Sequence, residues 1–233
     1  MRAKAALFDK DGTLFDFQKT WGGFVGDAIA HFANTPADAR AGLEQDLAAA
    51  VGFDLQTGLI LPHSPAIAGT VGDVADVFLP LLSSRSHDEL VRYLDDSSLA
   101  IAPIEVTPLI AFFDALAAAG LKTGVATNDS EAAARAHLGQ FNVEQRTDFI
   151  VGYDSGYGAK PGPGMCIAFA QKFVLDPSQV VMVGDSLHDL HAGRAAGMQT
   201  VAVLTGVATA DDLRDHADVV LSDITHLLDW LQT

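Results

Sequence analysis

The sequence has little sulfur and few basic residues. Cys166 is the only cysteine among 233 residues, so no intrachain disulfide can form and a cytoplasmic, reducing compartment is the simplest expectation. Lys and Arg total 14 against 30 Asp and Glu, which gives a formal net charge of −16 at pH 7. This charge repels phosphate backbones and anionic membrane surfaces, so we expect no nucleic-acid partner. A phosphate site here needs a local cation, main-chain N–H groups or a metal.

Long apolar runs are also absent. No stretch approaches the roughly 18 apolar residues of a membrane span, and residues 1–8 lack the long apolar stretch and cleavage site of a signal peptide. We therefore expect neither membrane insertion nor export. The composition, 49% hydrophobic and 19% charged, is typical of a compact folded chain. The oligomeric state is expected to be a monomer or a homodimer.

Short apolar runs alternate with longer helical patterns from about residue 105 onward. This alternation predicts an α/β fold with a parallel sheet and crossover helices. A helix is expected over residues 108–119, with Thr107 as its N-cap, Pro108 at its first position and Gly120 at its end. The expected strands are residues 5–8, 123–126, 149–151, 180–183, 200–204 and 219–221.

Residues 16–96 show a different pattern. Apolar residues recur there at helical spacing, as in Phe24, Val25, Ala28 and Ile29, and no strand is evident. The stretch 57–72 is rich in Gly, Pro, Ser and Thr, which predicts a loop. We therefore expect a small all-helical insert at 16–96 and an α/β core formed by 1–15 and 97–233.

The first chemical motif directly follows the first expected strand. It reads Asp9-Lys10-Asp11-Gly12-Thr13. Ligands of open parallel sheets bind beyond the carboxyl ends of the strands, so both acids are placed at the expected site. One carboxylate can attack a phosphoryl group while the other transfers protons, and Gly12 permits close approach of an anion. Asp-Gly is also a common turn, and the charge of Lys10 is expected to face solvent.

Two further motifs offer groups that can hold a phosphate. Thr127 and Asn128 follow the strand at 123–126 and can donate to phosphate oxygens without adding negative charge, although such residues are also ordinary helix caps. Asp129 is more simply read as a cap or a solvated acid. Lys160 lies in a loop between Gly and Pro residues and can counter phosphate charge, although most single lysines are solvated.

The fourth motif supplies the remaining acids. Asp185 follows the strand at 180–183, and Asp189 lies one helical turn later on the same side. Asp185 can join Asp9 around Mg²⁺, which prefers carboxylate oxygens and water. Asp189 can be a further metal ligand, or it can orient the ligands and waters without binding the metal itself. Both acids are also compatible with simple helix capping.

The order and spacing of these motifs resemble the haloacid dehalogenase superfamily, and in particular its phosphoglycolate-phosphatase-like group. The resemblance implies an open, Rossmann-like parallel sheet with a central first strand and an inserted helical cap. It also implies Asp9 as nucleophile, Asp11 as general acid and base, and Thr127 and Lys160 as phosphate ligands. Mg²⁺ would then be bound by Asp9, the main-chain carbonyl of Asp11 and Asp185. Dehalogenation is disfavoured, since dehalogenases of this superfamily lack the second aspartate.

These observations lead to one expected function and two alternatives. The expected function is Mg²⁺-dependent hydrolysis of a small phosphorylated metabolite, such as phosphoglycolate or a sugar phosphate. A phosphomutase would use the same aspartyl-phosphate but return the phosphoryl group to the sugar. A non-catalytic sensor or binding module for a phosphorylated ligand would keep the fold without turnover. The complete set of acids favours an enzyme over this module.

Overall fold

The computed structural model describes residues 2–233, which fall into two compact units. The first unit contains Met1–Phe17 and Ile104–Thr233, and the second is Gln18–Pro103. The boundaries lie a few residues beyond the limits of 16 and 96 that the sequence suggested. Each unit has its own buried side chains and is described separately.

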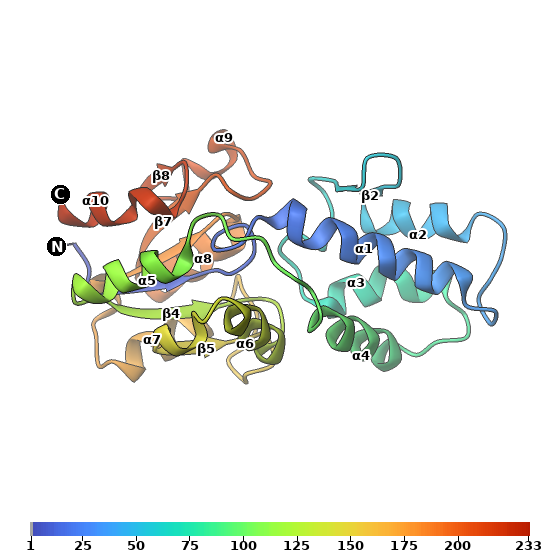
Figure 1. Cartoon of the computed structure of the whole chain (residues 1–233), viewed down its shortest axis with the longest axis horizontal. Coiled ribbons are helices and arrows are strands. Elements are labelled where there is room, and N and C mark those ends of the chain that lie inside the picture. The colour runs from blue at the N-terminus through green and yellow to red at the C-terminus, as the bar shows by residue number, and fades with distance from the viewer. Residues whose placement is uncertain (1) are drawn as a thin grey trace. The chain divides into compact units, whose positions relative to one another are not determined.

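A parallel sheet forms the centre of the first unit. In the described residues it has six strands in the order β5-β4-β1-β6-β7-β8 (Figure 1). Each strand ends within one residue of its predicted bounds, and β1 lies between β4 and β6, so the predicted open sheet is confirmed. The strands are β1 (Ala5–Phe8), β4 (Lys122–Ala126), β5 (Phe149–Val151), β6 (Val180–Gly184), β7 (Gln199–Val203) and β8 (Val219–Leu221).

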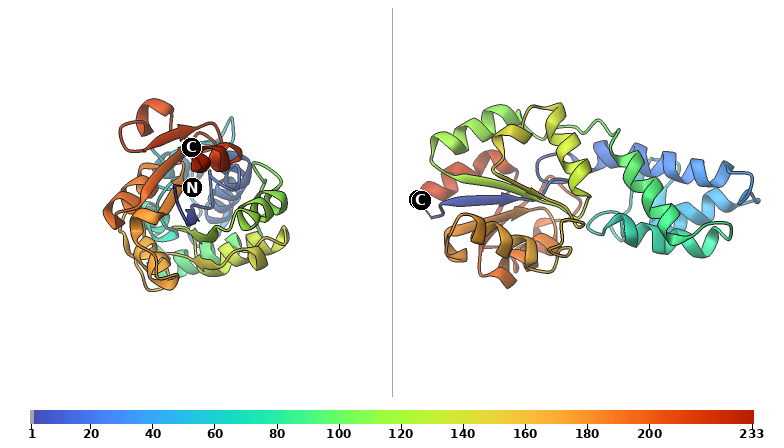
Figure 2. Two further views of the ribbon diagram at one scale, coloured as in Figure 1. Left: turned by 90° about the vertical axis from the view of Figure 1, so that its left-hand side faces the viewer. Right: turned by 90° about the horizontal axis from the view of Figure 1, so that it is seen from below.

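Helices cover both faces of this sheet (Figure 2). Alternate strand residues such as Ala6 and Phe8 pack with α5 (Leu109–Ala118), α6 (Glu131–Gln140) and α10 (Leu227–Gln232). Their neighbours Ala5 and Leu7 face α7 (Gly164–Lys172) and α8 (Leu187–Ala196). A strand covered on both sides has no polar face, which explains the unbroken apolar runs in the sequence.

The start of α5 differs from the prediction. Thr107 is not its N-cap: the preceding residue is Pro108, which makes no side-chain cap, and the N–H of Leu109 donates to Glu105 Oε1 at 2.9 Å. A carboxylate four residues earlier therefore satisfies the first free N–H of the helix. The remaining short elements of this unit are α9 (Ala210–Leu213) and single 3-10 turns at Glu144–Arg146, Pro177–Gln179 and Ile224–His226.

The second unit is mainly helical. Its helices are α1 (Phe17–Asn34), α2 (Leu43–Val51), α3 (Val71–Phe78), a 3-10 turn at Leu79–Leu81 and α4 (His87–Ser98). Thr70 and Ser86 form capping boxes at the starts of α3 and α4. The insert is not all-helical as predicted: it contains a short antiparallel pair, β2 (Phe53–Asp54) and β3 (Leu59–Ile60), of which only β3 lies within the stretch 57–72 expected to be a loop. None of the helices in the described part of the chain is both long and apolar enough to cross a bilayer.

Candidate active site

The sheet register brings three of the predicted motifs to one edge. Phe8, the last residue of β1, pairs with Val125 of β4 and Val183 of β6. The residues that follow these three neighbouring strands therefore lie at the same carboxyl edge. They are Asp9, Thr127 and Asp185, and all are buried. The position is the one at which open α/β sheets bind ligands.

Three carboxylates meet at this edge. Asp9, Asp185 and Asp189 each offer an oxygen, and these oxygens lie within 4.8 Å of one another. Thr13, in the turn after β1, lies with its hydroxyl 3.5 Å from Asp185 Oδ1. Acids from residues 9, 185 and 189 are thus brought together by the fold, as the strand-end argument predicts.

Lys160 is the cation of this carboxylate cluster. Its Nζ lies 2.5 Å from Asp9 Oδ1 and 2.6 Å from Asp189 Oδ1, and only 4% of the residue is exposed. The other oxygen of Asp189 accepts from the N–H and hydroxyl of Ser186, at 3.1 and 2.7 Å. Both oxygens of Asp189 are therefore engaged, and this acid orients Lys160 against Asp9. The alternative of a solvated lysine is excluded.

The pKa values of Asp9, Asp185 and Lys160 are all raised in the folded protein. Desolvation raises the pKa of Asp9 to about 7 despite the opposing charge of Lys160. Desolvation, with the neighbouring charges of Asp9 and Asp189, raises the pKa of Asp185 well above its usual range. Burial lowers the pKa of Lys160, but Asp189 and Asp9 outweigh it and the pKa is raised. One ammonium thus faces three acids, and a further cation would favour their ionised forms.

The Asp185 carboxylate packs directly against two glycines, Gly12 and Gly206, where a side chain would overlap it. A Cβ on Gly12, which has φ of +85°, would lie 2.3 Å from Asp185 Oδ2, and one on Gly206 would lie 1.7 Å from the same oxygen. The hydroxyl of Thr205 also donates to the Gly12 carbonyl at 2.6 Å. Sequence reasoning missed Gly206. It follows shortly after the end of β7, so the strand-end rule used for the other motifs could have identified it.

Asn128 positions the loop that carries Lys160. Its Nδ2 donates to the Lys160 carbonyl and its Oδ1 accepts from the Lys160 N–H, both at 2.8 Å. The side-chain amide is therefore engaged by the main chain of the protein. A phosphate contact through the main-chain N–H of Asn128 stays a prediction. Thr127 Oγ1 accepts from the N–H of Asp129 at 3.0 Å, which leaves its own hydroxyl proton for another acceptor.

The expectation that Lys10 faces solvent is wrong. Lys10 is fully buried, and its Nζ lies 2.7 Å from Asp11 Oδ2, 2.9 Å from Asp129 Oδ2 and 2.9 Å from His137 Nδ1. Burial lowers the pKa of this lysine, but the carboxylates of Asp11 and Asp129 outweigh it and raise the pKa. Asp129 is likewise a buried ion-pair partner and not a solvated acid.

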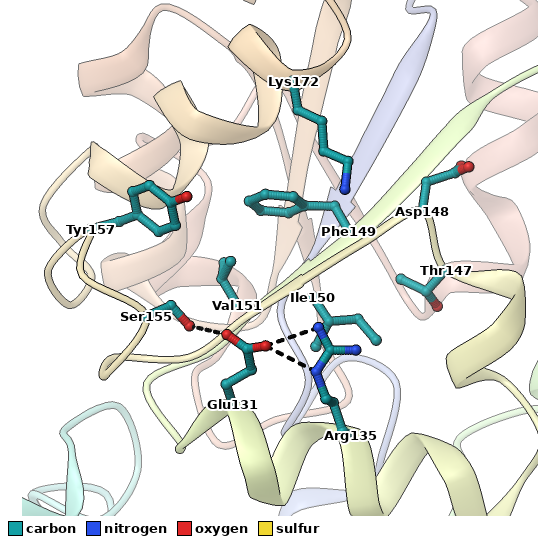
Figure 3. A pocket seen from close by; sticks show the side chains of 10 residues that line it. All are labelled: Glu131, Arg135, Thr147, Asp148, Phe149, Ile150, Val151, Ser155, Tyr157 and Lys172. Atoms are coloured by element: carbon teal, nitrogen blue, oxygen red, sulfur yellow. Dashed lines mark hydrogen bonds and ion pairs between the residues drawn. The ribbon is translucent and has the colours of Figure 1, made fainter.

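A separate pocket of about 270 Å³ lies along strand β5 and contains none of the predicted site residues (Figure 3). Glu131, one of the lining residues, accepts from Ser155 Oγ at 2.5 Å and from Arg135 Nε at 2.9 Å. The N–H of Glu131 donates to Asp154 at 2.9 Å. These contacts fix the loop after β5, which leads to Lys160, against the start of α6.

The sequence and the fold of this chain are similar to those of known proteins. A family model described as haloacid dehalogenase-like hydrolase matches residues 3–197. An N-acetylmuramic acid 6-phosphate phosphatase of Pseudomonas aeruginosa is 28% identical over 99% of this chain and 96% of its own length. A phosphoglycolate phosphatase of Rhodospirillum rubrum is 30% identical over 98% of this chain and 90% of its own length. The crystal structure of CbbY from Rhodobacter sphaeroides in complex with phosphate shares the fold, with a TM-score of 0.73, 19% identity and coverage of 99% and 100% of the two chains.

Proposed function

Because the chain belongs to the haloacid dehalogenase-like hydrolase family, we propose that it is a phosphoric monoester hydrolase that forms an aspartyl-phosphate on Asp9. The observation that carries this proposal is the contact between buried Asp9 and buried Lys160 at the carboxyl edge of the sheet. A carboxylate held beside an ammonium is suited to meet a phosphoryl group, because the cation offsets the repulsion between the two anions. Hydrolysis then proceeds in two steps.

The first step transfers the phosphoryl group to the enzyme. A carboxylate oxygen of Asp9 bonds to phosphorus while the bond from phosphorus to the ester oxygen breaks, and Asp11 gives a proton to the departing oxygen. Lys160 and the hydroxyl of Thr127 hold the other phosphate oxygens. In the second step water attacks the same phosphorus, Asp11 takes a proton from that water, and Asp9 leaves as a carboxylate. Inorganic phosphate is the product.

Mg²⁺ fits the donors of this site. Asp9 and Asp185 offer buried, hard oxygen donors, and within residues 2–233 the three acids of the cluster contact one ammonium, that of Lys160. We propose that Asp9, Asp185 and the main-chain carbonyl of Asp11 hold the ion. Asp189 is the fourth candidate, but its two oxygens already bind Lys160 and Ser186. When bound, Mg²⁺ supplies positive charge that neutralises the phosphate and the carboxylates.

The substrate class follows from the named relatives. Phosphatases for N-acetylmuramic acid 6-phosphate and for phosphoglycolate match nearly the whole chain. Both names specify a small phosphorylated metabolite, so we propose an ester of this size as substrate. A cytoplasmic location and a monomeric or homodimeric state remain predictions.

A phosphate-release assay tests the proposal. The panel contains 2-phosphoglycolate, N-acetylmuramic acid 6-phosphate, hexose phosphates and p-nitrophenyl phosphate, with Mg²⁺ or with EDTA. Release is expected with Mg²⁺ and should be lost in Asp9→Asn, because an amide cannot form the aspartyl-phosphate. Asp215→Asn, which removes an exposed carboxylate of the same unit, is the matched control. Substantial Mg²⁺-dependent release by Asp9→Asn would refute the nucleophile.

The same assay separates the alternatives. With a hexose 1-phosphate, an isomeric hexose phosphate as product would indicate the phosphomutase, and free phosphate indicates the hydrolase. Absence of release across the panel, combined with stabilisation of the fold by one of its esters, would indicate a binding module.

A further inference from the structure

Lys10 is placed to control the geometry of Asp11. Its ammonium lies 2.7 Å from Asp11 Oδ2 and is fully buried. Asp11 Oδ1 is buried as well, and it has no hydrogen-bond partner among residues 2–233. One oxygen of the proposed acid and base is therefore held by Lys10, while the other makes no hydrogen bond within the described residues.

The same ammonium connects Asp11 with the loop after β4. It lies 2.9 Å from Asp129 Oδ2 and 2.9 Å from His137 Nδ1 of α6. Asp129 is itself held, since its N–H donates to Thr127 Oγ1 and its Oδ1 accepts from the N–H of Ser130. Lys10 thus joins the turn that carries Asp11 to the loop that carries Thr127.

A buried ammonium between two carboxylates has a defined position. Its partners compensate for lost hydration, and short charged contacts in a dry interior tolerate little displacement. A cation facing the solvent would give Asp11 no comparable constraint. The buried position of Lys10 between Asp11 and Asp129 therefore fixes the orientation of the Asp11 carboxylate.

We propose that Lys10 is a positioning residue that holds Asp11 through Oδ2, so that Oδ1 faces the ester oxygen and later the attacking water. This inference rests on the proposed phosphatase function. It predicts that loss of Lys10 weakens proton transfer and leaves phosphoryl transfer to Asp9 otherwise intact.

Esters with different leaving groups make this role measurable. An alkyl phosphate needs a proton on its departing oxygen, whereas p-nitrophenolate departs without one. We expect Lys10→Met to lower kcat/KM roughly 10- to 100-fold for the fastest alkyl phosphate of the panel, in line with the size of acid–base and orientation effects. For p-nitrophenyl phosphate the decrease should stay below about 3-fold, because that step needs no proton. Lys4→Met, at an exposed position of the same unit, should change neither value.

A second variant separates positioning from folding. Lys10→Met alone leaves the buried carboxylate of Asp129 without its ammonium, which can unfold the protein. Lys10→Met/Asp129→Asn removes that unpaired charge and should recover most of the melting temperature. The selective loss with alkyl phosphates should persist in this double variant, because Asp11 still lacks its partner.

The measurements distinguish a purely structural role of Lys10 from a failure of the proposed function. Equal losses with both kinds of ester, or full recovery of alkyl-ester hydrolysis together with stability, would show that Lys10 has only a structural role. Wild-type protein that releases no phosphate from any ester would overturn the proposed function, and the role of Lys10 with it, before any variant is compared.

Discussion

The side-chain amide of Asn128 binds the main chain of Lys160 and not its ammonium group. Its amide donates to the carbonyl and accepts from the N–H of that single residue, each at 2.8 Å. The lysine ammonium is then free to reach Asp9 and Asp189. A residue after β4 therefore determines where a loop more than thirty positions later places its cation.

Replacing Asn128 with Ala should both destabilise the protein and misplace Lys160. The buried N–H and C=O of Lys160 would lose their partners, at about 1–3 kcal/mol for each unsatisfied group. We expect a lower free energy of unfolding and a roughly 10- to 100-fold decrease in kcat/KM, since small displacements of catalytic groups have effects of this size. Urea denaturation and phosphate release measure the two effects.

Asn34→Ala provides the control for this change. Asn34 is an exposed residue at the end of α1, where its amide donates to the Ala30 carbonyl. Its loss should leave kcat/KM unchanged. Wild-type kcat/KM in Asn128→Ala would show that Lys160 does not need this support.

Gly206→Ala should impair the metal site. A Cβ at this position would lie 1.7 Å from Asp185 Oδ2, so the carboxylate must move. We expect the Mg²⁺ concentration for half-maximal activity to rise at least about 10-fold, as is common when ligand support is lost. The Mg²⁺-dependent increase in melting temperature should shrink, which gives a readout independent of activity.

Gly23→Ala is the matched control, because a Cβ there meets nothing within 4 Å. It should leave the Mg²⁺ requirement unchanged. An unaltered Mg²⁺ requirement in Gly206→Ala would mean that Asp185 is not a ligand.

The strands, and the acids that follow them, were predictable from the sequence because the change from apolar to charged residues marks both. Strands covered on both faces are mostly apolar, so an acid such as Asp9 or Asp185 marks the end of the strand. Parallel strands then bring these points to one edge. Charge and hydrogen-bonding capacity at strand ends therefore point to the candidate site without knowledge of side-chain contacts.

The partners of long side chains were not predictable in this way. Lys10 was expected in solvent because lysines are rarely buried, but Asp129 and His137 lie more than a hundred positions away in the chain. The roles of Asn128 and Gly206 likewise depend on contacts with Lys160 and Asp185 that only the folded chain reveals. The pair β2 and β3 was missed because two-residue strands carry no periodic signal.

Cys166 should be unreactive in the folded protein. The thiol is buried in α7, and this burial raises its pKa to about 12. The thiolate is the reactive species, so at pH 8 native protein should react with a disulfide reagent roughly 10³-fold more slowly than unfolded protein. Labelling with and without guanidinium chloride measures the ratio. Complete labelling of the native protein within minutes would contradict the burial.

Asp38 should stabilise the second unit in a pH-dependent manner. Its Oδ1 accepts from the N–H and hydroxyl of Ser84 at 3.2 and 2.6 Å, and its Oδ2 accepts from Arg85 Nε at 3.2 Å. Burial alone would raise the pKa of this acid, but the bonds from Ser84 and Arg85 outweigh it and lower the pKa. A carboxyl whose pKa is lower when folded contributes stability above the unfolded pKa of about 4, and this contribution is lost as the pH falls further.

Asp38→Asn should therefore lower the free energy of unfolding by about 1–3 kcal/mol at pH 7, the size of a hydrogen bond to a charged group. The difference from wild type should narrow below about pH 4, where the carboxyl of the unfolded wild type is increasingly protonated. Urea denaturation followed by circular dichroism at pH 7, 5 and 3.5 measures both effects. Asp27→Asn, which removes an exposed carboxylate of the same unit, should show no such trend. A difference that stays constant with pH would contradict a role for the charge of Asp38, because protonation of the carboxyl removes that charge in the wild type and not in the variant.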